Sequence, residues 1–196
     1  GIRDKLVTGV QTCALPISGV DAANPRANNK MGQIIRWREG GDFDSLALRW
    51  DHLVLAGDPA NDKAEDRGNI KGDLFACPDG LMLDARGVLW IQTDASATEM
   101  NKGAFKNIGN NQMLACDPAT GEIRRFLTGP VNCAITGATM TSDGKTLFIN
   151  IQHPGETPAE VSDPSQPTRF SNWPLGGRPR SATVAIRRTD GGLVGT

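Results

Sequence analysis

Short apolar runs separated by turn residues recur along this chain. The pattern is clearest at 80–84 (GLMLD) and 88–93 (VLWIQT), which flank Ala85-Arg86-Gly87. Such runs around an Asp- or Gly-rich turn are typical of β-hairpins. No stretch keeps a helical period over three turns. We therefore predict an all-β chain, with strands over 32–37, 50–55, 80–84, 88–93, 112–116, 122–127, 137–141, 146–151, 182–187 and 193–194.

A weak internal repeat organises these strands. The segments PDGLMLDARGVLWIQTD from Pro78 and ITGATMTSDGKTLFINIQ from Ile135 align Gly87 with Gly144, 57 residues later. Four antiparallel strands per repeat of about 50 residues are typical of a propeller blade. The fold class predicted is a β-propeller fragment of about two and a half blades of four-stranded antiparallel sheet, because closed propellers need roughly four to eight blades. The blades are placed at 32–55 (an outer half), 80–127 and 137–194.

The connections between the predicted strands alternate between short and long. The short turns lie inside hairpins, and the long connections share the opposite end of the sheets. Long loops on a rigid scaffold are the usual place for binding and catalysis. Because the innermost strand of a blade lines the central channel, Asp79 and Thr136 are expected to face that channel. The long connections are 58–77, 94–111, 129–136 and 152–181.

Residues 1–18, GIRDKLVTGVQTCALPIS, follow neither a strand, a helix nor a signal-peptide pattern. They resemble the conceptual translation of a short-read sequencing adapter. We predict that 1–18 is an adapter-derived, non-native segment that packs poorly, and that 19–196 is the C-terminal part of a β-propeller domain. On this interpretation the native N-terminus, with any export signal, is missing. The alternative is an unusual N-terminal arm.

Composition excludes several classes of protein. Lys and Arg total 21 and Asp and Glu total 22 in 196 residues, which gives a formal charge of −1. Nucleic-acid binding, which needs a basic stripe, is therefore not expected. No apolar run reaches the roughly 18 residues of a membrane span. No P-loop, dinucleotide fingerprint or nucleophile elbow is present. The cysteines fit no zinc spacing, and Cys77, Cys116 and Cys133 are predicted to be small core residues.

Two aspartates on the long-loop side are candidate metal ligands. Asp79 stands at the predicted channel mouth, where a carboxylate could bind calcium, a cation that prefers oxygen ligands. A turn aspartate that caps backbone amides is an equally good interpretation of this residue. Asp94 follows a strand on the same side, and Thr93 and Ser96 could add oxygens. A polar start to a loop explains Asp94 as well.

The remaining candidates are histidines, arginines and amides. His153, in Gln-His-Pro-Gly-Glu, could be a metal ligand, an acid or base, or a phosphate hydrogen-bond donor, or simply a turn histidine. Arg178 and Arg180 suit bidentate phosphate contact, although a solvated pair is the commoner case. His52 is predicted to be structural. The amides in the run 110–112 are expected to bond across loops.

The whole pattern resembles the C-terminal third of PhoX-type alkaline phosphatases, over nearly all of 19–196. The resemblance implies a secreted or periplasmic bacterial β-propeller enzyme that leaves the cytoplasm folded by the twin-arginine route. It implies hydrolysis of phosphomonoesters with calcium and ferric iron, by an intact parent that is a monomer. The resemblance rests on DAANPRANNKMGQIIRWRE, PDGLMLDARGVLWIQTD, NNQMLACDPATGEIRRFLTGP, SDGKTLFINIQHPGE and SNWPLGGRPRSATVAIRR.

Carried over to this chain, the resemblance implies that Asp79, His153 and Glu156 belong to the site. Chain topology adds Asp94, and side-chain chemistry adds Arg180. The predicted site therefore has Asp79, Asp94 and Glu156 as metal ligands and His153 and Arg180 as catalytic residues. Metal ions suit this chemistry because they polarise phosphoryl oxygens and position the nucleophile.

The chain departs from the family pattern at one position. Members of the family carry Glu in a CE-x-TG stretch, where this chain has Ala134. If that Glu contacts metal, Ala134 removes a carboxylate. We expect the chain alone to be inactive. Two other functions stay open: a calcium-dependent propeller hydrolase of the lactonase type, and a non-catalytic ligand-binding propeller.

Overall fold

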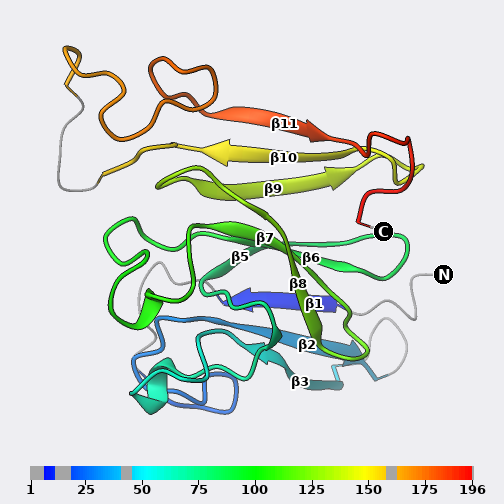
Figure 1. The fold of residues 1–196 in the computed structure, drawn as a ribbon. Coiled ribbons are helices and arrows are strands. Elements are labelled where there is room, and N and C mark those ends of the chain that lie inside the picture. Colours follow the sequence, from blue (N-terminus) through cyan, green and yellow to red (C-terminus); the bar gives the residue numbers. More distant parts are fainter. Residues whose placement is uncertain (1–6, 12–18, 41–45, 158–162, 196) are drawn as a thin grey trace.

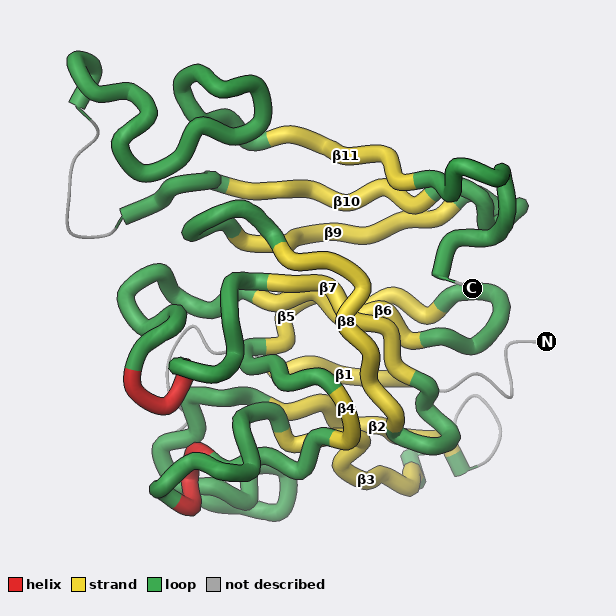
Figure 2. Tube along the Cα trace, in the orientation of Figure 1, coloured by secondary structure: helices red, strands yellow, loops and turns green. Residues whose placement is uncertain are grey.

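A computed structural model describes residues 7–11, 19–40, 46–157 and 163–195 of the chain. Over these residues the structure consists of strands and loops, with two single-turn 3-10 helices at Ala64–Asp66 and Gly103–Phe105 (Figure 2). None of the described helices is long and apolar enough to cross a membrane. The predicted all-β class is confirmed.

The described strands form three sheets that lie one above another in Figure 1. The first sheet has the order β1 (Val7–Gln11), β2 (Gln33–Glu39), β3 (Leu48–Leu55). The second has the order β4 (Lys71–Gly72), β8 (Glu122–Thr128), β7 (Gln112–Cys116), β6 (Leu89–Thr93), β5 (Pro78–Leu83). The third has the order β11 (Ala182–Ile186), β10 (Leu147–Gln152), β9 (Ala134–Met140).

The middle sheet is covered on both faces, which explains why β6 is apolar almost throughout. Successive side chains of a strand point to opposite faces. Leu89 and Ile91 accordingly pack toward the first sheet, with Ile34 of β2. Trp90 packs toward the third sheet, with Leu147 of β10. Burial on both faces removes the polar alternation that a strand with one wet face would show.

The innermost strands of the three sheets are neighbours, since β5 lies beside both β1 and β9. Long connections lie at one end of the strands, on the left of Figure 1, and the tight hairpin turns lie at the other. The predicted separation of short and long connections is therefore confirmed. The full blade predicted over 80–127 corresponds to the hairpins β5–β6 and β7–β8.

Three details differ from the sequence prediction. The two residues of β4 pair in parallel with β8 and show no strand pattern of their own. Residues 193–194 form no strand. Val194 is buried, its N–H donates to the Gly144 carbonyl at 3.0 Å, and its carbonyl accepts from the Arg86 guanidinium at 2.8 Å. β9 begins at Ala134, earlier than predicted, because Gly137 adopts a φ of 51° and accommodates a bulge opposite β10.

Five residues of the segment predicted to pack poorly, Val7–Gln11, form a strand. These residues form β1, which pairs antiparallel with β2 from Val7↔Trp37 to Gln11↔Gln33. Pairing of this kind needs main-chain N–H and C=O groups at an open sheet edge, not a particular side-chain pattern. The remainder of 1–18 lies outside the described residues. The adapter origin of this segment therefore stays a prediction.

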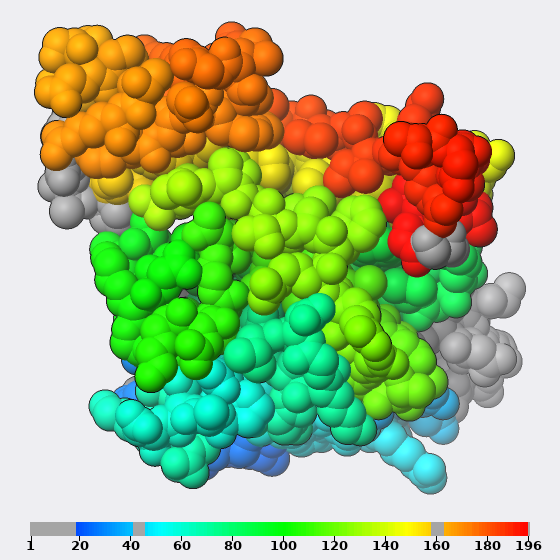
Figure 3. Space-filling view, viewed as in Figure 1, coloured from blue at the N-terminus to red at the C-terminus, as the bar shows by residue number. Residues whose placement is uncertain are grey.

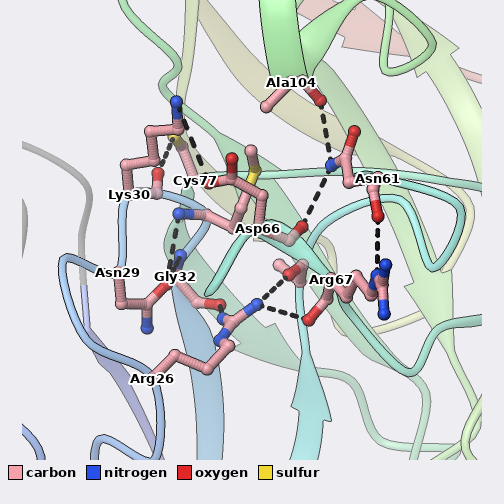
Figure 4. A network of polar contacts seen from close by, with 11 residues as sticks. Arg26, Asn29, Lys30, Gly32, Asn61, Asp66, Arg67, Cys77 and Ala104 are labelled. Atoms are coloured by element: carbon pink, nitrogen blue, oxygen red, sulfur yellow. Dashed lines mark hydrogen bonds and ion pairs between the residues drawn. The ribbon is translucent and has the colours of Figure 1, made fainter. Parts of the chain in front are cut away.

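A buried arginine fixes the chain before the first outer strands (Figure 4). The guanidinium of Arg26 donates to the carbonyls of Ala56 (2.7 Å), Arg67 (2.9 Å) and Gly32 (2.6 Å). Three separate segments therefore share one planar donor group, which suits the fixed geometry of arginine. This network holds the beginning of the 58–77 connection against β2.

Candidate functional site

The long connections form a single end of the molecule. In Figure 3 the green residues that connect β6 to β7 and the orange residues that connect β10 to β11 lie on the same side. Between them, an open pocket of about 180 Å³ is formed by three connections, β6–β7, β8–β9 and β10–β11. Its lining residues are Asp94, Ala95, Ser96, Ala97, Met100, Asn111, Asn132, Cys133, Ala134 and Glu156.

Two predicted metal ligands, Asp94 and Glu156, line this pocket together. The pKa of Asp94 is raised, mainly because neighbouring atoms keep water from its carboxylate. The carboxylates of Asp79 and Glu156 raise it further, and the imidazole of His153 lowers it. Asp94 as a residue is exposed, so solvent screens part of this interaction. The structure thus brings three other predicted site residues, Asp79, His153 and Glu156, within electrostatic range of Asp94.

Main-chain hydrogen bonds position these side chains. The Asp94 N–H donates to the Cys77 carbonyl at 3.0 Å, which places Asp94 beside the start of β5, where Asp79 lies. The Glu156 N–H donates to the carbonyls of Asn132 (3.2 Å) and His153 (3.0 Å). Main-chain bonds therefore hold Asp94 in the β6–β7 connection and Glu156 in the β10–β11 connection.

Three residues beside Asp94 and Glu156 have a left-handed backbone conformation. Cys77, Asn132 and His153 have φ values of 52°, 50° and 42°. Such values are costly for residues other than glycine and concentrate at functional sites. His153 directly follows β10 and is exposed, and its N–H donates to the Ser181 hydroxyl at 3.0 Å. The conformation turns the chain sharply before Glu156.

Ala134 occupies a wall of the pocket and is 5% exposed. The position at which the resemblance implies Glu therefore lines the same pocket as Asp94 and Glu156. A side chain that ends at Cβ leaves this wall without a carboxylate. The departure noted in the sequence thus falls inside the candidate site.

The arginines are not brought to the pocket. Arg180 is exposed and does not line it, and its N–H donates to the Trp173 carbonyl at 3.2 Å. Arg178 instead lines a second hollow of about 170 Å³. That hollow also includes Gly155 and Phe170, so the two hollows lie on either side of the turn that ends at Glu156.

His52 and the cysteines have the structural roles that were predicted from the sequence. His52 contacts the Ala23 carbonyl through Nε2 at 3.0 Å and meets Trp50 edge-on at 5.5 Å. The three cysteines outside 1–18 are buried, as predicted for small core residues. Burial raises the pKa of Cys116 to about 11 and that of Cys133 to about 12, so both thiols stay protonated and unreactive near neutral pH.

The donor chemistry of the site fits a hard cation. Asp79, Asp94 and Glu156 offer carboxylate oxygens, the ligands that calcium prefers, and mutual repulsion disfavours the charged form of Asp94. A positive ion would remove that repulsion. Among the described residues, however, no group of three or more His, Cys, Asp or Glu is close enough to hold a metal by itself. These residues can supply part of a coordination sphere.

The described residues form an all-β, propeller-like scaffold with acidic residues gathered at its long-loop end, and this defines the architectural class of the chain. The family model described as alkaline phosphatase PhoX matches residues 7–155. The chain therefore belongs to the PhoX alkaline phosphatase family. No curated protein matches the chain significantly.

A solved structure is similar over almost the whole chain. It is described as Pseudomonas fluorescens PhoX in complex with vanadate, a transition state analogue. The two share 42% sequence identity with a TM-score of 0.78, over 98% of this chain and 33% of that one. The chain thus spans about a third of that relative, and its fold is a propeller-like fragment.

Proposed function

We propose that this chain forms part of a metal-dependent phosphomonoester hydrolase, an alkaline phosphatase of the PhoX type. The observation that supports this most directly is the pocket in which Asp94 and Glu156 meet, within electrostatic range of Asp79 and His153, in a chain of this family. Vanadate, which the solved relative binds, is described there as a transition state analogue. A phosphoryl group is the corresponding ligand for this pocket.

The proposed roles follow from the chemistry of each side chain. Asp79, Asp94 and Glu156 would hold calcium or ferric iron together with residues that this chain does not include. When bound, such an ion polarises phosphoryl oxygens and lowers the pKa of coordinated water. His153, exposed at the end of β10, would donate a hydrogen bond or a proton to the leaving oxygen. Arg180 remains a predicted phosphate contact.

The decisive experiment measures phosphomonoesterase activity of the full-length parent protein. Hydrolysis of p-nitrophenyl phosphate would be followed at alkaline pH with calcium, after chelation, and after calcium is restored. We expect activity that chelation abolishes and calcium recovers, and no turnover by the 196-residue chain alone. Asp94→Asn should abolish activity. Asp62→Asn, at an exposed residue of the 58–77 connection, should leave it unchanged.

Ala134 favours one alternative, a non-catalytic propeller that binds a ligand at the same pocket. Tight calcium binding without turnover of any phosphoester would support that alternative. Hydrolysis of lactones but not of phosphomonoesters would instead identify a lactonase-type enzyme. Either result would contradict the phosphatase proposal.

Location in the periplasm or outside the cell, and a monomeric parent, belong to the same proposal. Their support is membership of the PhoX family. Cell fractionation of the parent organism tests the location, and light scattering of the full-length protein tests the monomer. A cytoplasmic protein would contradict the proposed export.

A further inference from the structure

Asn111 lies at the wall of the pocket, just before β7, and is 2% exposed. Its Oδ1 accepts hydrogen bonds from the Thr93 hydroxyl (3.0 Å) and the Ala95 N–H (2.7 Å). Its Nδ2 donates to the carbonyls of Ala95 (2.9 Å) and Cys133 (2.8 Å). A primary amide offers two lone pairs and two N–H groups, so these four bonds use its full capacity.

The four bonds connect the two segments that present the pocket carboxylates. Ala95 directly follows Asp94 in the β6–β7 connection. Cys133 directly follows Asn132, whose carbonyl accepts the N–H of Glu156 at 3.2 Å. One buried amide therefore links the second sheet to the third at the level of the pocket.

Main-chain contacts fix the orientation of this amide in turn. The Asn111 carbonyl accepts the Gly129 N–H at 2.8 Å. The Thr93 hydroxyl that donates to Asn111 also accepts the Gln112 N–H at 2.8 Å. Rotation of the Asn111 side chain would break several bonds at once, so it has one favourable arrangement.

We propose that Asn111 is a positioning residue that sets the separation of the Asp94 and Glu156 carboxylates at the cation site. This inference rests on the proposed function, because it assigns the pocket to a cation. Asn111 acts through the segments it joins and is not a catalytic residue. Two carboxylates repel each other, so without the amide the segments at 94–97 and 131–134 are expected to separate.

The test compares two buried asparagines whose side chains each make four hydrogen bonds. Asn29 is also 2% exposed, and it lies on the first sheet's side of the molecule (Figure 4). Its Nδ2 donates to Asn24 Oδ1 (3.0 Å) and Gln33 Oε1 (2.7 Å), and its Oδ1 accepts the N–H groups of Met31 (3.2 Å) and Gly32 (3.1 Å). None of these partners lines the pocket. Asn29→Leu is therefore the matched control for Asn111→Leu.

Two measurements separate positioning from general stability. The first is amide hydrogen exchange without metal, and the second is the calcium dissociation constant by calorimetry. Asn111→Leu should accelerate exchange at Ala95 and Glu156 and leave Ala115, inside β7, unchanged. It should weaken calcium binding on the order of tenfold or more, as loss of an outer-shell partner typically does. Asn29→Leu should lower the melting temperature but change neither measurement.

Asn111→Ser, which is shorter and adds no bulk, gives the same readouts if the leucine variant does not fold. Protection of the Glu156 amide and calcium affinity that both match the wild type would overturn the positioning role. If the wild-type protein binds no calcium, the metal part of the proposed function fails. The exchange pattern at Ala95 and Glu156 then still decides whether Asn111 holds the two segments.

Discussion

Ala134 lines the pocket at the position where the family resemblance implies Glu. Adding charged oxygen ligands to a site increases its affinity for calcium. We therefore expect Ala134→Glu to tighten calcium binding on the order of tenfold, measured by titration calorimetry. Thr139→Glu, on the exposed side of β9, should leave the affinity unchanged. Equal affinity in the wild type and Ala134→Glu would show that this wall does not face the ion.

Two substitutions of His153 separate the strain of its backbone from the chemistry of its imidazole. Its φ of 42° costs about 1 kcal/mol or more for a residue with a Cβ. His153→Gly should raise the free energy of unfolding by about that amount, whereas His153→Ala should not. Both variants lose the imidazole, so both should lose activity in the full-length enzyme. Urea denaturation and phosphatase assays test the two effects separately, and full activity of either variant would remove His153 from the proposed mechanism.

The sequence predicted the individual site residues unevenly. Asp79, Asp94 and Glu156 were found because blade topology and family resemblance place them at one end of the sheets. In the sequence, Asn111 can be recognised only as a side chain with hydrogen-bond donors and acceptors. Its partners lie 16 to 22 residues away along the chain, so no local pattern identifies them. Arg180 was predicted from its chemistry alone, and the fold does not direct it to the pocket.

At the scale of elements, Asp84 fixes the β5–β6 hairpin. Its Oδ2 accepts from the Arg86 guanidinium (2.7 Å) and Trp90 Nε1 (3.1 Å), and its Oδ1 accepts the N–H groups of Arg86 (2.9 Å) and Val88 (3.1 Å). Burial alone would raise the pKa of Asp84, but these bonds outweigh it and the pKa is lowered. The charged form therefore stabilises the hairpin.

We expect Asp84→Asn to lower the free energy of unfolding by about 2 kcal/mol near neutral pH. A depressed pKa in the folded state gives stability that is present above the ordinary value of 3.8 and lost as pH falls through the folded pKa. The gap between the wild type and Asp84→Asn should therefore shrink in acid. Asp143→Asn, in the exposed turn of the β9–β10 hairpin, is the control with a smaller effect. A gap that does not change with pH would contradict this role of the charge.

Hairpins were the elements that the sequence predicted best, because an apolar run and an Asp-Gly turn are both local signals. β4 escaped prediction since two residues carry no periodicity and its pairing to β8 depends on a distant partner. Residues 193–194 have the apolar character of a strand, but Val194 uses it to fill space against the third sheet rather than to extend a ladder.

At the scale of the molecule, the outer edge of β3 is exposed and apolar. Leu48 and Trp50 of β3 are 52% and 41% exposed, next to the fully exposed Leu46. Exposed edge strands with apolar side chains favour association between chains. The double substitution of Leu48 and Trp50 by lysine should reduce self-association, measured by light scattering at increasing concentration. Unchanged association would exclude this edge, and Val20→Lys serves as a control at an exposed apolar residue outside the strands.

The bonds through Asn111 also bear on how this site could be transferred or diversified. Copying Asp94 and Glu156 alone onto another propeller would leave nothing to fix the distance between the two carboxylates. The smallest unit worth grafting is a pair of adjacent blades with the amide between them. The connection at 163–181, in contrast, contributes no residue to that joint or to the carboxylate pocket. A library can vary this region without disturbing the acids if it keeps Trp173, which packs against the core, Arg180, and Ser181, whose hydroxyl accepts the His153 N–H.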